Sequence, residues 1–124
     1  MNYDEKGIGD SEIPRASSPI FQHLLKTYAS EANKLNSVWL EFSEDDLGFR
    51  PHARSSTVRE IIEHELLSVR RFFGEFLGLP EPPAAQVLPE TRTPVSYATR
   101  MLDLSRARLK FLAVTRFRDQ VEQV

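Results

Sequence analysis

The chain has 124 residues, of which 40% are hydrophobic and 27% are charged, and its formal net charge is −2 at pH 7. This composition is typical of one globular domain. Because the chain has no cysteine, it excludes disulfide frameworks, thiolate nucleophiles and zinc–thiolate sites. No run approaches the ~20 apolar residues of a membrane span, and the polar N-terminus is unlike a signal peptide. We therefore expect a soluble cytoplasmic protein with no membrane partner.

Residues 1–17 are polar and acidic, and we expect them to form a disordered leader before one domain over residues 18–124. The first helix is predicted over residues 18–43, because Ser18 fits an N-cap and Pro19 fits the first helical position. Asn33 in this helix either faces a polar cavity or is a surface amide. The apolar residues of the helix recur at the spacing of one face: Phe21, Leu24, Leu25, Tyr28, Ala32, Leu35, Trp39 and Phe42.

A polar connector follows the first helix, and Gly48 and Pro51 interrupt it. His52 comes directly after Pro51 in a polar loop. This position favours an exposed imidazole. The alternative is a histidine at the mouth of the helical bundle that faces a site.

The second helix is predicted over residues 57–77, and it begins with a capping box between Thr57 and Glu60. Its apolar residues cover nearly half of the helix circumference, which is more than one neighbouring helix needs. We therefore expect two partner helices. The apolar residues are Val58, Ile61, Ile62, Leu66, Val69, Phe72, Phe73, Phe76 and Leu77.

His64 falls at the edge of this apolar stripe, one turn after Glu60. The residue types favour a half-exposed histidine that is held by Glu60. The alternative is a metal ligand on the inward side of a bundle, with Glu60 as its supporting hydrogen-bond partner.

Residues 79–94 contain five of the eight prolines, which predicts a stiff crossover on the surface. The third helix is predicted over residues 94–124, and its apolar pattern is still helical at Val124. One apolar face among the three helices then lacks a partner, so we expect a homo-oligomer that forms through the uncovered face.

Nucleic acid is not an expected partner. The basic residues near the C-terminus scatter around the predicted helix, and no aromatic alternation for base stacking accompanies them. They are Arg100, Arg106, Arg108, Lys110, Arg116 and Arg118.

Several segments together resemble the DinB/YfiT-like family of four-helix-bundle metalloenzymes. Ser56–His64 is similar to the "S-V-R-E-I-hydrophobic-x-H" opening of the family's second helix, and Asp46–Pro51 looks like its "dL-x-frP" connector. Tyr28 and Asn33 in the first helix extend the resemblance upstream, and Ser105–Arg108 extends it more weakly downstream. The resemblance covers about residues 18–120 and implies an all-α, up-and-down bundle, of which this chain supplies three long helices.

In that family, one histidine of the second helix and two histidines four residues apart on the fourth helix hold a divalent metal. The resemblance therefore implies Zn²⁺ or Ni²⁺ at His64, with Glu60, His52 and Asp45 as candidate helpers. The other two family ligands have no counterpart in this sequence, and a metal that activates water or a thiolate needs about three protein ligands. The sequence therefore leaves the metal site incomplete and assigns no catalytic residue.

Two functions remain open. In the first, the chain is a divalent-metal-binding protein related to thiol-dependent transferases and metal-dependent hydrolases, with a small-molecule or thiol substrate. In the second, it is a non-catalytic, truncated helical-bundle protein that acts through self-association, with its second or third helix packed against the same helix of a second copy.

Overall fold

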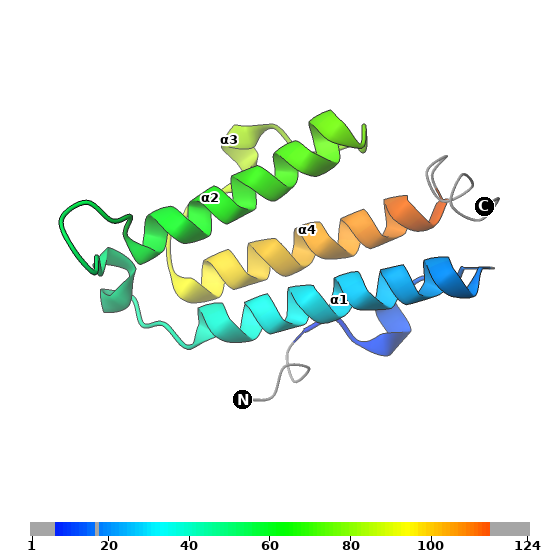
Figure 1. Ribbon diagram of the computed structural model, residues 1–124, viewed down its shortest axis with the longest axis horizontal. Helices are drawn as coiled ribbons and strands as arrows, with labels where there is room; N and C mark the ends of the chain where they lie inside the picture. Colours follow the sequence, from blue (N-terminus) through cyan, green and yellow to red (C-terminus); the bar gives the residue numbers. More distant parts are fainter. Residues whose placement is uncertain (1–6, 17, 115–124) are drawn as a thin grey trace. The chain divides into compact units, whose positions relative to one another are not determined.

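The computed structural model describes residues 7–16 and 18–114, and these residues form helices and no strand. The helices are α1 (Pro19–Leu40), α2 (Val58–Arg71), α3 (Ala84–Val87) and α4 (Pro94–Val114) (Figure 1). The all-α class predicted from the sequence is confirmed. The last part of the predicted third helix, residues 115–124, lies outside the described residues.

The first two helices end earlier than predicted, at Leu40 and at Arg71. Local interactions accompany each end. After α1, the Ser43 N–H donates to Asp46 Oδ2 at 2.8 Å and the Asp46 N–H donates to Ser43 Oγ at 3.3 Å. This reciprocal pair starts a 3-10 turn over Asp45–Gly48. After α2, the backbone changes to a π-helical turn over Phe72–Phe76, and Gly78 then adopts a φ of 72°, which glycine tolerates best.

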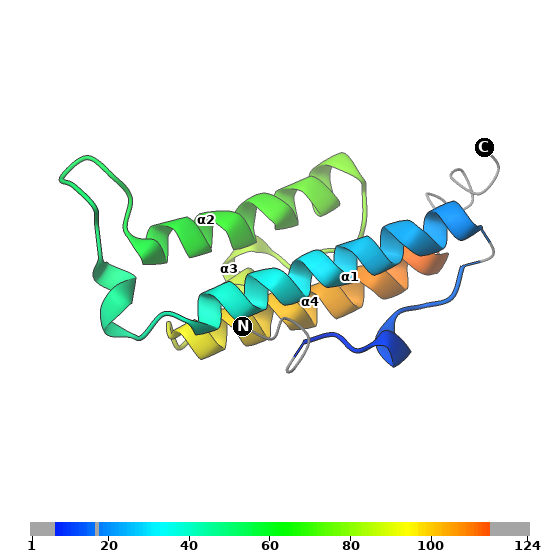
Figure 2. The same cartoon turned by 60° about the horizontal axis from the view of Figure 1, so that its bottom comes forward.

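The chain divides into two compact units. The first contains Met1–Ser37 and Met101–Val124, and the second contains Val38–Arg100. In the first unit, α1 and α4 lie side by side and run in opposite directions (Figures 1 and 2). The Tyr28 hydroxyl reaches Ser105 Oγ at 3.5 Å across this helix pair. The buried apolar side chains of the first unit include Ile8, Phe21, Leu25, Ala29, Met101, Leu102, Leu109 and Leu112.

Residues 7–16, which we expected to be a disordered leader, are hydrogen-bonded to α1. The Asn33 side chain accepts from the Ile8 N–H at 2.6 Å and donates to the Ile8 carbonyl at 3.0 Å. Asn33 is therefore a buried amide, 3% exposed, and not the surface amide that was one of our two expectations. An amide side chain has a donor and an acceptor, so it satisfies both backbone groups of one residue.

A second amide binds the same leader segment further along. The N–H of Ala16 donates to Gln22 Oε1 at 2.8 Å, and Gln22 Nε2 donates to the Pro14 carbonyl at 3.1 Å. On the other helix of this unit, Arg106 Nε donates to Glu12 Oε1 at 3.0 Å. Residues 7–16 are thus held by polar side chains of both α1 and α4.

The second unit is organised around α2. The predicted capping box at its start is confirmed: the Glu60 N–H donates to Thr57 Oγ1 at 3.1 Å, and the Thr57 N–H donates to Glu60 Oε1 at 3.2 Å. Helix α2 contacts the turn Asp45–Gly48 and the short helix α3. The buried apolar side chains of this unit include Trp39, Leu47, Ile62, Leu66, Phe73, Leu79, Val87 and Tyr97.

Within the ranges that the structure describes, no helix combines the length and the apolar composition that crossing a membrane requires.

Candidate functional site

His64 lies on the exposed side of α2. Its Nε2 is 3.2 Å from Ser68 Oγ, one turn further along the same helix. We expected the Glu60 carboxylate to hold the His64 imidazole. In the structure the hydrogen-bond partner of His64 is Ser68.

Glu60 is engaged at the start of α2. Its Oε1 accepts from the backbone N–H and the hydroxyl of Thr57, at 3.2 and 3.0 Å, and it lies 3.5 Å from Arg50 Nη2. The backbone hydrogen bond from Thr57 is the largest cause that lowers the pKa of the Glu60 carboxyl, and the Thr57 hydroxyl and Arg50 act in the same direction. Glu60 therefore stabilises the helix start as a carboxylate.

His52 is exposed in the loop before α2, as its loop position favours. Its backbone N–H donates to Ser55 Oγ at 3.2 Å, and its Nδ1 accepts from the Arg54 N–H at 3.4 Å. These contacts stabilise the loop itself.

His64 and its candidate helpers Glu60, His52 and Asp45 do not assemble into a metal site among the described residues. In the described part of the chain, no group of three or more histidine, aspartate or glutamate side chains is arranged to hold an ion. His64 bonds within its own helix, Glu60 forms the cap, and His52 belongs to its loop. The donor set among these residues does not fit a Zn²⁺ or Ni²⁺ centre, which needs about three protein ligands. The ion at His64 stays a prediction.

The apolar stripe of α2 is only half covered. Ile62, Leu66 and Phe73 are buried, whereas Ile61 is 59% exposed, Phe72 is 49% exposed and Phe76 is 79% exposed. We call Ile61, Phe72 and Phe76 the apolar row. Ile61 and Phe72 are about three helical turns apart and therefore share one face.

The π-helical turn places the two phenylalanines of the apolar row against each other. The Phe72 and Phe76 rings stack with their centroids 5.5 Å apart and an angle of 13° between their planes. Phe72 also meets the buried Phe73 ring edge-on at 5.5 Å. The row thus presents a preformed aromatic pair next to the core of the second unit.

A second cluster in this unit joins α2 to the start of α4. Glu63 Oε2 accepts from Arg92 Nη1 at 2.7 Å and also accepts from the Tyr97 hydroxyl. Tyr97 is fully buried. Burial is the largest cause that raises the pKa of the Tyr97 phenol, and its hydrogen bond to Glu63 acts in the same direction. The hydrogen bond to Glu63 likewise raises the pKa of the Arg92 guanidinium.

Sequence reasoning missed this cluster because its members lie far apart in the chain. In the sequence, Tyr97 occupies an apolar position of the predicted third helix. Glu63 lies on the polar side of the predicted second helix. The cluster satisfies the one polar group of a buried tyrosine.

Comparisons with protein-family models, with curated proteins and with solved structures find no match to the chain. The resemblance of Ser56–His64 and Asp46–Pro51 to a family therefore rests on the motifs in the sequence.

The raised pKa of Tyr97 predicts a loss of stability at high pH. The folded state holds the phenol proton more tightly than the unfolded chain does, so this contribution is complete below about pH 10, the ordinary tyrosine pKa, and is lost as the pH rises above it. Urea unfolding at pH 8 and at higher pH measures the loss. We expect the Tyr97→Phe variant to lose less stability than the wild type over this interval, because it has no phenol at this position. Equal losses in both proteins would contradict the assignment.

Proposed function

We propose that this chain is a DinB-like helical protein that acts without catalysis, through self-association on the apolar row of α2. The observation that supports this proposal most directly is the exposure of Ile61, Phe72 and Phe76 on one helix and the turn that follows it. The DinB-like label is supported by the motifs at Ser56–His64 and Asp46–Pro51.

The size of the apolar row implies a weak dimer. Fully burying one Ile or Phe side chain contributes about 1.5–3 kcal/mol. Two copies of a three-residue row that is already part-buried therefore gain roughly 6–10 kcal/mol, which is offset by an association cost of about 4–15 kcal/mol. At most about 6 kcal/mol remains, so the dissociation constant is on the order of tens of micromolar or weaker.

The charges beside the row favour an antiparallel pair. Glu65 and Arg71 are both exposed on α2, on either side of Ser68. A twofold axis at Ser68 places Glu65 opposite the partner's Arg71, which also pairs with Glu75 of its own helix at 3.1 Å. The same axis places Ile61 opposite the partner's Glu75, one residue before the partner's Phe76. A parallel pair would instead set each charge against its own copy, which is unfavourable. A second copy of this chain is therefore the occupant that complements the row.

The Phe76→Ser variant tests this proposal. We expect its dimer to dissociate at concentrations at least about tenfold higher than the wild type, because two large apolar contacts are lost per dimer. Sedimentation velocity over a range of concentrations measures the effect. The matched control is Phe49→Ser, since Phe49 is 61% exposed but lies outside α2. A wild-type monomer at the highest concentration, or equal effects of both substitutions, would contradict the proposal.

A second candidate function is metal binding at His64. It is favoured by the exposed imidazole, whose Nε2 lies 3.2 Å from the Ser68 hydroxyl of its own helix, and by the family that the surrounding motif resembles. The remaining ligands of such an ion would come from outside the described residues.

Metal analysis separates the two candidates. If the second holds, the purified protein retains one equivalent of Zn²⁺ or Ni²⁺ after dialysis, and the His64→Ala variant loses it. The control variant His52→Ala keeps the ion unless the loop histidine is also a ligand. Retention of the ion in His64→Ala, or no retention by the wild type, would contradict metal binding at His64 and leave self-association as the remaining candidate.

A further inference from the structure

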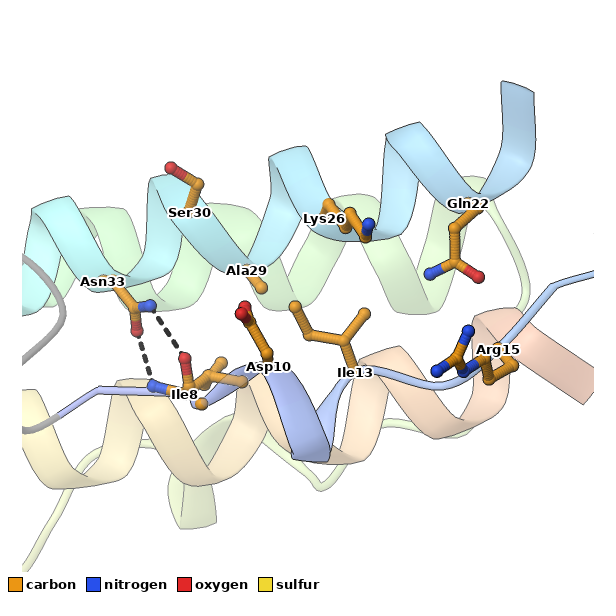
Figure 3. A pocket seen from close by; sticks show the side chains of 10 residues that line it. Ile8, Asp10, Ile13, Arg15, Gln22, Lys26, Ala29, Ser30 and Asn33 are labelled. Carbon is orange, nitrogen blue, oxygen red and sulfur yellow. Dashed lines mark hydrogen bonds between the residues drawn. The ribbon is translucent and has the colours of Figure 1, made fainter. Parts of the chain in front are cut away.

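A pocket lies between the leader segment and α1 in the first unit. Its volume is about 540 Å³, which is within the ~300–1,000 Å³ range of small-molecule sites. Figure 3 shows its lining, with side chains from residues 8–15 on one side and from α1 on the other. The lining residues are Ile8, Gly9, Asp10, Ile13, Arg15, Gln22, Lys26, Ala29, Ser30 and Asn33.

Two amide side chains keep this pocket open. Asn33 bonds both backbone groups of Ile8 at one end, and Gln22 bonds Pro14 and Ala16 at the other. The two amides lie about three turns apart on α1 and so share one face of the helix. The chain between them forms the 3-10 turn Asp10–Glu12, so the leader is attached to α1 at its ends and stands off in between (Figure 3).

The turn over the pocket is itself fixed. Glu12 Oε2 accepts from the Gly9 N–H at 2.9 Å, and Glu12 Oε1 accepts from Arg106 Nε at 3.0 Å. The Gly9 hydrogen bond is the largest cause that lowers the pKa of the Glu12 carboxyl, and Arg106 acts in the same direction. The pocket is therefore formed before any ligand binds, which reduces the ordering that binding would require.

The lining combines apolar and charged side chains, and the Asp10 carboxylate points toward Ala29 between Ile8 and Ile13 (Figure 3). Ile8 and Ala29 are buried, whereas Arg15 and Lys26 are exposed. In the described residues, the side chains of Arg15 and Lys26 take part in no ion pair and no hydrogen bond. Arg15 and Lys26 contribute two positive charges and Asp10 contributes one negative charge, so the formal charge of the lining is +1.

We propose that this pocket binds a small organic monoanion, namely a carboxylate with an apolar body. Arg15 and Lys26 pair with the carboxylate, because a guanidinium and an ammonium are suited to carboxylate oxygens. The apolar body lies on Ile8, Ile13 and Ala29. Asp10 repels a second negative charge, so the pocket discriminates against dianions. This inference does not rest on the proposed self-association, since all residues that carry it belong to the first unit.

The test titrates the full chain with hexanoate and phenylacetate, followed by ligand-observed NMR. We expect saturable binding with dissociation constants on the order of a millimolar, as suits ligands of this size. The neutral primary amides of the same acids should bind more weakly, because they keep the apolar body and lose the charge. Equal binding of acid and amide, or no saturation up to about 10 mM, would overturn the proposal.

Variants locate the binding. Arg15→Gln and Lys26→Gln should each weaken hexanoate binding about threefold to fivefold, which is the upper part of the range for exposed ion pairs. The control is Lys34→Gln, because Lys34 lies on the same helix outside the pocket and pairs with Glu31 at 3.4 Å. Asp10→Asn should improve binding of the dianion adipate, which the wild type rejects. If Lys34→Gln weakens binding as much as Lys26→Gln does, or Asp10→Asn leaves adipate binding unchanged, the carboxylate does not occupy this pocket.

Discussion

The apolar stripe of α2 is wider than the surface that its neighbours cover, and this excess determines which side chains of the second unit stay exposed. A helix that is apolar over nearly half of its circumference must have partners on both sides or leave apolar side chains in water. In this chain Ile62 and Leu66 are buried, while Ile61 and Phe72 remain exposed. The capping box at Thr57 fixes the residue at which the helix begins. The spacing of the apolar residues after it then determines which side chains lie on the buried face and which on the exposed face. Self-association is the direct way to cover such a row.

The polar side chains of α1 produce a separate feature in the first unit. Asn33 and Gln22 bind backbone groups of the leader at two places, Ile8 and the stretch from Pro14 to Ala16. A buried amide needs its hydrogen bonds, so these contacts hold the segment at two fixed points. The pocket between them is a consequence of this spacing, and its cationic side chains are Arg15 and Lys26.

Much of the fold could be predicted because its signals are local. Pro19, Pro94 and the pair Thr57 and Glu60 set helix starts within one turn of sequence, and the structure places the helices there. The π-helical turn over Phe72–Phe76 was not predicted, since no motif in the sequence signals this change and the predicted helix continued to Leu77.

The contacts that connect distant residues could not be read from the sequence. Asn33 and Ile8 are 25 residues apart, and Tyr97 and Glu63 are 34 apart. No periodicity relates such positions, so the bonded leader and the buried tyrosine cluster appear only in three dimensions. His64 shows the same limit within one helix: the sequence predicted support from Glu60, whereas the neighbour that bonds to it is Ser68.

Self-association through an antiparallel α2 pair is tested most directly by a cysteine placed at its centre. Because the chain has no cysteine, the Ser68→Cys variant contains one thiol, which the twofold axis would bring face to face with its copy. Under mild oxidation we expect rapid formation of a disulfide-linked dimer by Ser68→Cys, and much slower crosslinking by Lys34→Cys, because Lys34 is exposed on α1. Equal crosslinking rates for the two variants would contradict the antiparallel pair.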